Sequence, residues 1–149
     1  MVEKLFPELY KLEIPLPKNP LKALNSYVFK GKERNLIIDT GMNREECKEK
    51  MFLGLEELGI DLEKTDFFIT HMHADHSGLV SSLTGETSKV YCSETDAGYI
   101  NIDKDFWEKA RIFTKTGGFP EKELQEAISR HPGFKYREKE HINFSFVKE

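Results

Sequence analysis

The sequence contains few cysteines, no long apolar run and no excess of positive charge. Its 149 residues include two cysteines, Cys47 and Cys92, which are too few for a disulfide framework and which we expect to stay reduced. No run of about eighteen apolar residues is present, so a membrane-spanning helix is excluded. The first residues lack the apolar segment of a secretory signal. These absences predict a cytoplasmic protein without a membrane partner.

The charge balance of the chain is slightly acidic. Its 26 acidic residues exceed the 22 basic ones and give a formal net charge of −4. Because proteins bind nucleic acid through basic surfaces, nucleic acid is not an expected partner. Hydrophobic residues make up 38% of the chain and charged residues 32%, a mixture typical of globular proteins. We therefore expect a globular protein that acts on a small molecule.

The first seventy residues predict alternating strands and helices. Residues 25–29 and 36–39 are typical of strands, with a hairpin turn at 31–34, and residues 66–70 form a further short apolar run. A helix is predicted between the last two strands, because apolar residues recur there at helical spacing: Cys47, Met51, Leu55 and Leu58. This order predicts a parallel crossover and an α/β domain.

The predicted helix has recognisable start and stop signals. Asn43 is a good helix cap, and Glu46, three residues later, completes a pattern like a capping box. Gly59 stands where a glycine commonly ends a helix in the left-handed conformation. We therefore expect a helix that begins at Asn43 and ends before Gly59.

The second half of the chain is patterned more loosely. Residues 89–92 are typical of a buried strand, residues 103–131 of a helical insertion, and residues 132–149 of a terminal strand. Large aromatic residues mark the insertion: Phe106, Trp107, Phe113 and Phe119. They either cover a substrate pocket as a lid does or pack helices onto a core, and the sequence leaves both alternatives open.

The chemistry of the chain is concentrated in residues 70–78, Thr-His-Met-His-Ala-Asp-His-Ser-Gly. Three of the five histidines fall within six residues, directly after a predicted buried strand. In an extended loop His71 and His73 point the same way and can meet one ion, while Asp75 and His76 can face a second. Imidazole and carboxylate ligands suit zinc and also iron or manganese. A surface histidine cluster is the alternative.

These residues resemble a known family. Residues 70–78 resemble the T-H-x-H-x-D-H-x-G signature of the metallo-β-lactamase superfamily, and residues 36–41, Leu-Ile-Ile-Asp-Thr-Gly, look like the strand and aspartate that precede it there. The resemblance implies an αββα sandwich with two divalent metal ions, zinc above all. It assigns His71 and His73 to the first ion and Asp75 and His76 to the second. Asp39 would steady these ligands through hydrogen bonds.

The resemblance implies metal-assisted hydrolysis. A metal-bound water loses a proton near neutral pH and attacks as hydroxide, and Asp75 would be the catalytic residue that orients this water or relays its proton. Ester, thioester, lactone and amide substrates all fit this chemistry. The alternatives are a nuclease of the same superfamily and a non-catalytic metal-binding module. A diiron branch is disfavoured, because it typically has glutamate where this chain has His73.

The chain departs from the family after residue 98. Three later ligands are typical of the family: a histidine in a Gly-His loop, an aspartate that bridges both ions, and a final histidine. None of them has a convincing counterpart in this chain, and His131 and His141 are not expected to bind metal. His131 instead suits the C-terminus of a helix, where a charged imidazole is favourable.

We therefore expect residues 1–149 to form a single incomplete domain whose C-terminal portion is missing. In this interpretation residues 1–102 are a half-sandwich with the metal motif, residues 103–131 the helical insertion and residues 132–149 the terminal strand. A half-sandwich exposes an apolar sheet face, which promotes association. A homodimer through that face is accordingly expected.

Overall fold

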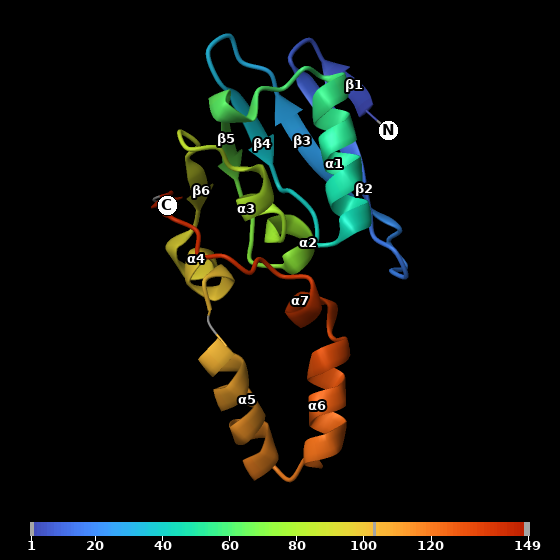
Figure 1. Ribbon diagram of the computed structural model, residues 1–149, viewed down its shortest axis with the longest axis vertical. Helices are drawn as coiled ribbons and strands as arrows, with labels where there is room; N and C mark the ends of the chain where they lie inside the picture. Colours follow the sequence, from blue (N-terminus) through green and yellow to red (C-terminus); the bar gives the residue numbers. More distant parts are fainter. Residues whose placement is uncertain (1, 103, 148–149) are drawn as a thin grey trace.

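The computed structural model describes residues 2–102 and 104–147, leaving out the side chains of residues 104–108 and 110. In chain order the elements are β1 (Val2–Phe6), β2 (Leu9–Pro15), β3 (Ala23–Phe29), β4 (Asn35–Ile38), α1 (Glu45–Glu57), the 3₁₀ helix η1 (Leu62–Lys64), β5 (Thr65–Phe68), α2 (Ala74–Ser77), α3 (Val80–Leu83), β6 (Val90–Cys92), α4 (Glu94–Ile100), α5 (Lys104–Thr116), α6 (Glu121–Arg130), α7 (Pro132–Lys135) and β7 (Phe144–Phe146). Figure 1 shows the helices α1 to α3 against the sheet and α5 and α6 extending away from it. Among the described residues, no helix has the length and apolar character needed to cross a membrane.

The strands form one seven-stranded sheet in the order of the sequence, from β1 to β7. Strands β1 to β4 run antiparallel through successive hairpins, and the pairs β4–β5, β5–β6 and β6–β7 are parallel. The predicted hairpin between β3 and β4 and the crossover through α1 are both confirmed. In a parallel sheet the strand ends that carry functional loops lie along one edge, and this arrangement places the loops after β4, β5 and β6 together.

One face of the sheet carries the core. The fully buried residues of neighbouring strands alternate toward this face, among them Ile14, Val28, Ile37 and Phe67. Helix α1 covers it with the apolar positions that the sequence predicts, since Cys47, Met51, Leu55 and Leu58 are all buried. Gly54 lets the helix approach the sheet, because a Cβ at this position would stand 2.2 Å from the Leu12 side chain. The core therefore depends on a close contact between α1 and β2.

Helix α1 begins later than its sequence signals predict. It starts at Glu45, the capping residue is Arg44, and no side chain caps it. The predicted cap at Asn43 is wrong: Asn43 precedes the capping residue and donates to the tail of the chain, through its backbone N–H to Tyr136 O at 2.8 Å and through Nδ2 to Arg137 O at 3.4 Å. The far end agrees with the sequence: Gly59 is left-handed, with a φ of 65°. A long-range contact to the tail of the chain has thus replaced a local cap.

The opposite face of the sheet carries a half-buried apolar row. The strand register places Tyr27 beside Ile38, Ile38 beside Phe68, and Phe68 beside Tyr91. All four side chains are half-buried, and Phe29 on the same face is 41% exposed. Since no described helix contributes a buried partner for this row, the face is more open than the one that α1 covers.

Helices α5 and α6 form a hairpin that projects from the body (Figure 1). Its two helices are joined by Glu121, which accepts hydrogen bonds from Arg111 and, at 2.7 Å, from Lys115 Nζ. Phe113 is 80% exposed and Phe119 62% exposed, so these two aromatic residues neither cover a pocket nor pack into the core. The side chains of Phe106 and Trp107 lie outside the described residues.

The chain returns from the hairpin to the sheet. Residues 132–149 begin with the short helix α7 rather than a strand, and β7 covers only Phe144–Phe146, parallel to β6. Asn101 and Ile142 exchange two hydrogen bonds, Nδ2 to O at 2.9 Å and N to Oδ1 at 3.0 Å. This exchange joins the segment before the hairpin to the segment after it, at the edge of the body.

A carboxylate–guanidinium pair fastens the parallel strands at their N-terminal ends. Arg34 donates to Asp66 through Nε (3.0 Å) and Nη2 (2.7 Å), and Asp66 also accepts the backbone N–H of Lys89 at 2.9 Å. The hydrogen bonds from Arg34 are the main reason that the pKa of Asp66 lies below its usual value. One carboxylate therefore connects the segments that lead into β4, β5 and β6.

We predict that Asp66→Asn lowers the free energy of unfolding at pH 7 and makes that free energy less dependent on pH in the acidic range. A carboxyl whose pKa is lower in the folded state contributes stability above its unfolded pKa, near 3.9, and loses that contribution as the pH falls from there through its folded pKa. Because the pair is partly exposed, the expected loss is about 1 kcal/mol at pH 7 and smaller at pH 2. Urea unfolding at both pH values measures it. Glu57→Gln, an exposed carboxyl-to-amide control, should change neither value.

Candidate metal centre

The centre is built on Asp39, which follows directly after β4. Asp39 adopts a left-handed backbone conformation, with a φ of 58°, which aspartate tolerates better than most residues. Its side chain is 8% exposed. The backbone N–H of Asp39 donates to Phe68 O at 3.0 Å, which continues the pairing of β4 with β5 by one residue. The strand therefore delivers this carboxylate to the sheet edge where the histidines lie.

The Asp39 carboxylate organises the histidine loop. It accepts the backbone N–H of Thr70 at 2.9 Å and lies within 3.0 Å of Thr70 Oγ1 through both oxygens. Its Oδ2 is 2.7 Å from Nδ1 of His76. A carboxylate can only accept here, so Nδ1 of His76 carries the proton of this bond. The remaining ring nitrogen, Nε2, is thereby left as the metal-binding atom.

Thr40 fixes the backbone of His76. Both its N–H and its Oγ1 donate to the carbonyl of His76, at 2.7 and 2.9 Å. The same hydroxyl accepts the backbone N–H of Leu79 at 3.2 Å, and the Thr40 side chain is fully buried. The pair Asp39–Thr40 therefore holds the ring and the backbone of His76 from two directions.

The four predicted ligands lie as two pairs of donor atoms. Nε2 of His71 is 3.0 Å from Nδ1 of His73, and Nε2 of His76 is 3.8 Å from Oδ2 of Asp75. The rings of His71 and His76 are also close, with their centroids 4.1 Å apart. Within the described part of the chain, no group of three or more histidine, cysteine, aspartate or glutamate side chains is arranged around one ion position. The donor types of these residues suit a metal ion, and the structure arranges them as two close pairs.

The neighbours of these rings shift their pKa values in opposite directions. Burial, together with the nearby His76 and His73 rings, lowers the pKa of His71 and favours its neutral, metal-binding form. Burial also acts to lower the pKa of His76, but the hydrogen bond and the charge of Asp39, with the charge of Asp75, outweigh it and raise that pKa. Asp39 therefore acts on the electrostatics of the loop as well as on its geometry.

A second carboxylate that the sequence analysis did not single out supports the loop. Asp96, in α4, accepts the backbone N–H of Met72 at 3.0 Å, and Met72 lies between the first two histidines. Asp96 is itself held by Ser93, whose Oγ donates to Oδ2 at 2.7 Å and accepts the Asp96 N–H at 3.0 Å. The Ser93-x-x-Asp96 spacing is a helix-start signal, but its link to Met72 depends on the fold.

The tail of the chain docks on the segment that follows the histidines. Glu138 is 3% exposed, and its carboxylate accepts the N–H of Ser81 at 2.8 Å and the Ser81 hydroxyl at 2.7 Å. Gly78 allows the tail to come this close: a Cβ there would stand 2.6 Å from Asn43 N and 2.7 Å from Tyr136 O. Three backbone segments therefore meet at Gly78.

The two other histidines lie in the tail of the chain, outside the residues 70–78. His141 is exposed. His131 follows α6, as predicted, but it also caps α7: its Nδ1 accepts the Gly133 N–H at 3.2 Å.

Comparison with known proteins decides the family. The sequence model of the metallo-beta-lactamase superfamily matches residues 20–138. The chain belongs to this superfamily. A metallo-beta-lactamase family protein from Thermus thermophilus superposes on 98% of the chain with a TM-score of 0.70 and 25% sequence identity. A subclass B3 metallo-beta-lactamase from a soil metagenome library superposes on 67% with a TM-score of 0.55 and 20% identity. The predicted fold class is thereby confirmed.

Two fungal proteins are similar in sequence. A lactamase-like protein of Pestalotiopsis microspora is 34% identical over 104 residues, 67% of this chain. The atrochrysone carboxyl ACP thioesterase of Emericella nidulans is 34% identical over 82 residues, 55% of this chain. The matched regions make up 30% and 25% of these two proteins, and 48% of the Thermus protein. The chain therefore spans less than half the length of the relatives that it matches.

We predict that Asp39→Asn destabilises the protein by about 1–3 kcal/mol, because a buried set of hydrogen bonds loses its acceptor. Asparagine tolerates the left-handed conformation, so the loss would report the hydrogen bonds rather than backbone strain. Thermal or urea unfolding of the metal-free protein measures it. Asp75→Asn is the matched control, since no hydrogen bond to Asp75 exists among the described residues. Equal stability of the two variants would contradict the organising role of Asp39.

We also predict that Gly78→Ala breaks the hydrogen bond between Asn43 and Tyr136, because the new Cβ would collide with both backbones. The expected cost is about 1–3 kcal/mol, with faster hydrogen exchange of the Asn43 amide. Gly98→Ala provides the control, because a Cβ at this helical position meets nothing within 4 Å and should stabilise slightly. Unchanged protection of the Asn43 amide in the Gly78 variant would contradict the prediction.

Proposed function

We propose that this chain carries the metal-binding part of a metal-dependent hydrolase that cleaves an ester or thioester. The observation that supports the proposal most directly is the pairing of donor atoms: His71 with His73, and Asp75 with His76, side by side on one loop. The carboxylate of Asp39 behind His76 is the kind of partner that orients a histidine toward a metal. Zinc is the expected metal, with iron and manganese as alternatives.

Two bound divalent ions would supply an acidified water as nucleophile and would polarise the scissile carbonyl group. The residues of the chain provide the rest of the chemistry. In the neutral ring of His76, Asp39 holds the proton on Nδ1 and so leaves the lone pair on Nε2. Asp75 is half-buried, and none of the described residues donates a hydrogen bond to it. It is therefore free to accept a proton from the attacking water.

The choice of an acyl substrate follows from two considerations. A similar protein is named as an acyl-carrier-protein thioesterase, and ester, thioester, lactone and amide cleavage share one mechanism at such a centre. The net charge of −4 disfavours the alternative of a nuclease. The homodimer and the cytoplasmic location suggested by the sequence stay predictions.

We expect this chain to bind zinc only weakly by itself. Each pair supplies two donors, whereas catalytic zinc sites use about three protein ligands. Further ligands would have to come from elsewhere in a longer polypeptide, in keeping with the greater length of the relatives. Hydrolysis of p-nitrophenyl esters and acyl thioesters by the 149-residue chain is accordingly expected to be slow.

The decisive test is metal binding by single-histidine variants. Titration calorimetry with zinc, after stripping with EDTA, should show binding by the wild type and at least about a tenfold weaker affinity for His71→Ala, because one of two paired donors is lost. His141→Ala removes an exposed histidine outside the cluster and should bind as the wild type does. Absence of zinc, iron and manganese binding by the wild type would overturn the proposal, and so would equal losses in the two variants.

A further inference from the structure

A cavity opens beside His73 at the base of the helical hairpin. Its volume is about 270 Å³, slightly below the range of about 300–1,000 Å³ typical of small-molecule pockets. Its apolar wall comes from the histidine loop and from the end of α4: Met72, Ala74, Tyr99, Ile100 and Ile102. This wall borders a predicted metal ligand and suits a hydrocarbon group, whereas polar residues line the remainder of the cavity: Ser77, His131, Arg137 and Glu138.

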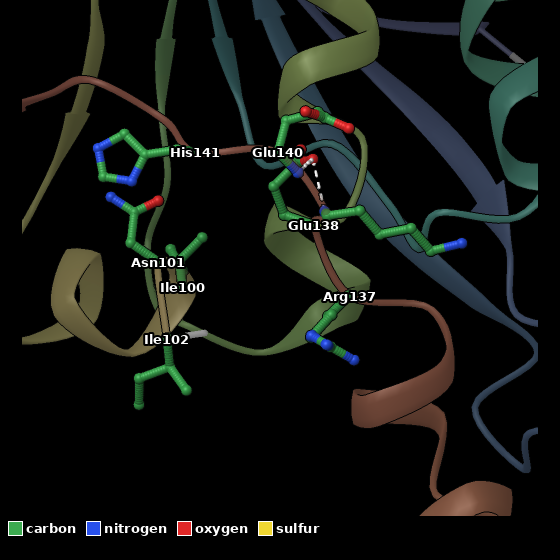
Figure 2. A pocket seen from close by; sticks show the side chains of 8 residues that line it. Ile100, Asn101, Ile102, Arg137, Glu138, Glu140 and His141 are labelled. Carbon is green, nitrogen blue, oxygen red and sulfur yellow. Dashed lines mark hydrogen bonds between the residues drawn. The ribbon is translucent and has the colours of Figure 1, made fainter. Parts of the chain in front are cut away.

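The far wall of the cavity carries Arg137. This side chain also lines a larger neighbouring cavity of about 520 Å³, which shares Ile100, Ile102 and Glu138 with the first. Figure 2 shows Ile100 and Ile102 on one side of this space and Arg137 and Glu138 on the other. A cation therefore faces an apolar wall, close to the loop that holds the histidines.

Arg137 has no counter-charge among the described residues. Its Nη1 donates to Phe134 O at 2.5 Å and its guanidinium lies 4.5 Å from the centre of the Phe134 ring, but no ion pair to a described carboxylate is formed. Burial lowers its pKa, and no acidic neighbour opposes that effect. Since arginine has five N–H donors, several remain available to a ligand.

The adjacent carboxylate of Glu138 does not neutralise this arginine. Its two oxygens accept four hydrogen bonds, from Ser81 N and Oγ and from the backbone N–H groups of Lys139 and Glu140. The dashed lines in Figure 2 mark the contacts of Glu138 with the backbone of the tail. A carboxylate saturated in this way is fixed in place, so the positive charge of Arg137 stays available to an incoming anion.

From these contacts we propose that the cavity binds an amphiphilic anion, with its hydrocarbon part against Ile100, Ile102 and Tyr99 and its carboxylate or phosphate on Arg137. This proposal rests on the proposed function, because it assigns to the hydrolase a substrate that carries an anionic group in addition to the bond that is cleaved. The planar guanidinium suits both anions, since each can accept two parallel hydrogen bonds. The size of the cavity favours a medium-length chain over a bulky ring system.

The test measures ligand binding to the EDTA-treated protein, so that neither metal nor hydrolysis contributes. Octanoate, octyl phosphate and octanol are compared by chemical-shift titration. We expect at least one of the two anions to bind about tenfold or more tightly than octanol, and the better anion identifies the group that Arg137 prefers. Equal affinities of the wild-type protein for octanol and both anions would overturn the proposal, and so would the absence of binding of all three compounds.

Variants then locate the anion. Arg137→Gln should remove the preference for the anion over octanol, and Arg137→Lys should keep part of it, because lysine retains the charge but not the fork of donors. Arg130→Gln, which removes an exposed arginine of α6, should leave the preference intact. Retention of the full preference in a folded Arg137→Gln protein would place the anion elsewhere and overturn the proposal.

The outcomes separate this inference from the hydrolase proposal. If zinc binding depends on His71 but the stripped protein shows no preference for an anion, the anion site is contradicted and the hydrolase proposal is still supported. If the anion preference depends on Arg137 but the protein binds no metal, the anion site is supported and the hydrolase proposal is contradicted.

Discussion

The buried carboxylate of Asp39 is the interaction on which the candidate centre depends. It lies in a left-handed conformation at the end of β4 and accepts hydrogen bonds from Thr70 and His76, which belong to the loop after β5. Two parallel strands are thereby locked together at the edge where the donor atoms gather. Leaving such an acceptor unsatisfied is costly in a buried site, so the position of the loop depends on its hydrogen bonds to Asp39.

Long-range contacts support this carboxylate from outside. Asp96 holds the backbone of Met72 from α4, and Glu138 holds Ser81 from the tail. Each joins the histidine segment to a part of the chain that comes later in the sequence. The loop is therefore held by hydrogen bonds to one segment that precedes it in the sequence and to two segments that follow it. Such contacts can keep a short polar loop in one conformation although it has no large apolar core of its own.

Local patterns predict the first half of the chain well. The spacing of Cys47, Met51, Leu55 and Leu58 identifies the buried face of α1, and the apolar runs identify β4, β5 and β6, because helix and strand periodicities are properties of neighbouring residues. The cluster of histidines likewise indicates the candidate centre, and the structure brings those side chains together.

The contacts that the sequence does not reveal are those made between distant segments. Asn43 has the appearance of a helix cap, yet it pairs with Tyr136, and Glu138 has the appearance of one more charge in a polar tail, yet it is buried. In both cases tertiary contacts override a local preference. Arg137 is similar, because a lone arginine in a charged segment gives no sign that it will face an apolar wall.

The paired hydrogen bonds between Asn101 and Ile142 make the helical hairpin an appendage that the sheet does not need. They close the chain across the base of the hairpin, next to the pairing of β6 with β7. Because the entropy of loop closure rises only slowly with loop length, this position would accept insertions of quite different sizes without disturbing the histidine loop. The roots of the hairpin nevertheless contribute Ile102 and Gly133 to the cavity beside His73. A change in the hairpin alone would therefore alter the walls of this cavity, while the hydrogen bonds of Asp39 to the histidine loop stayed the same.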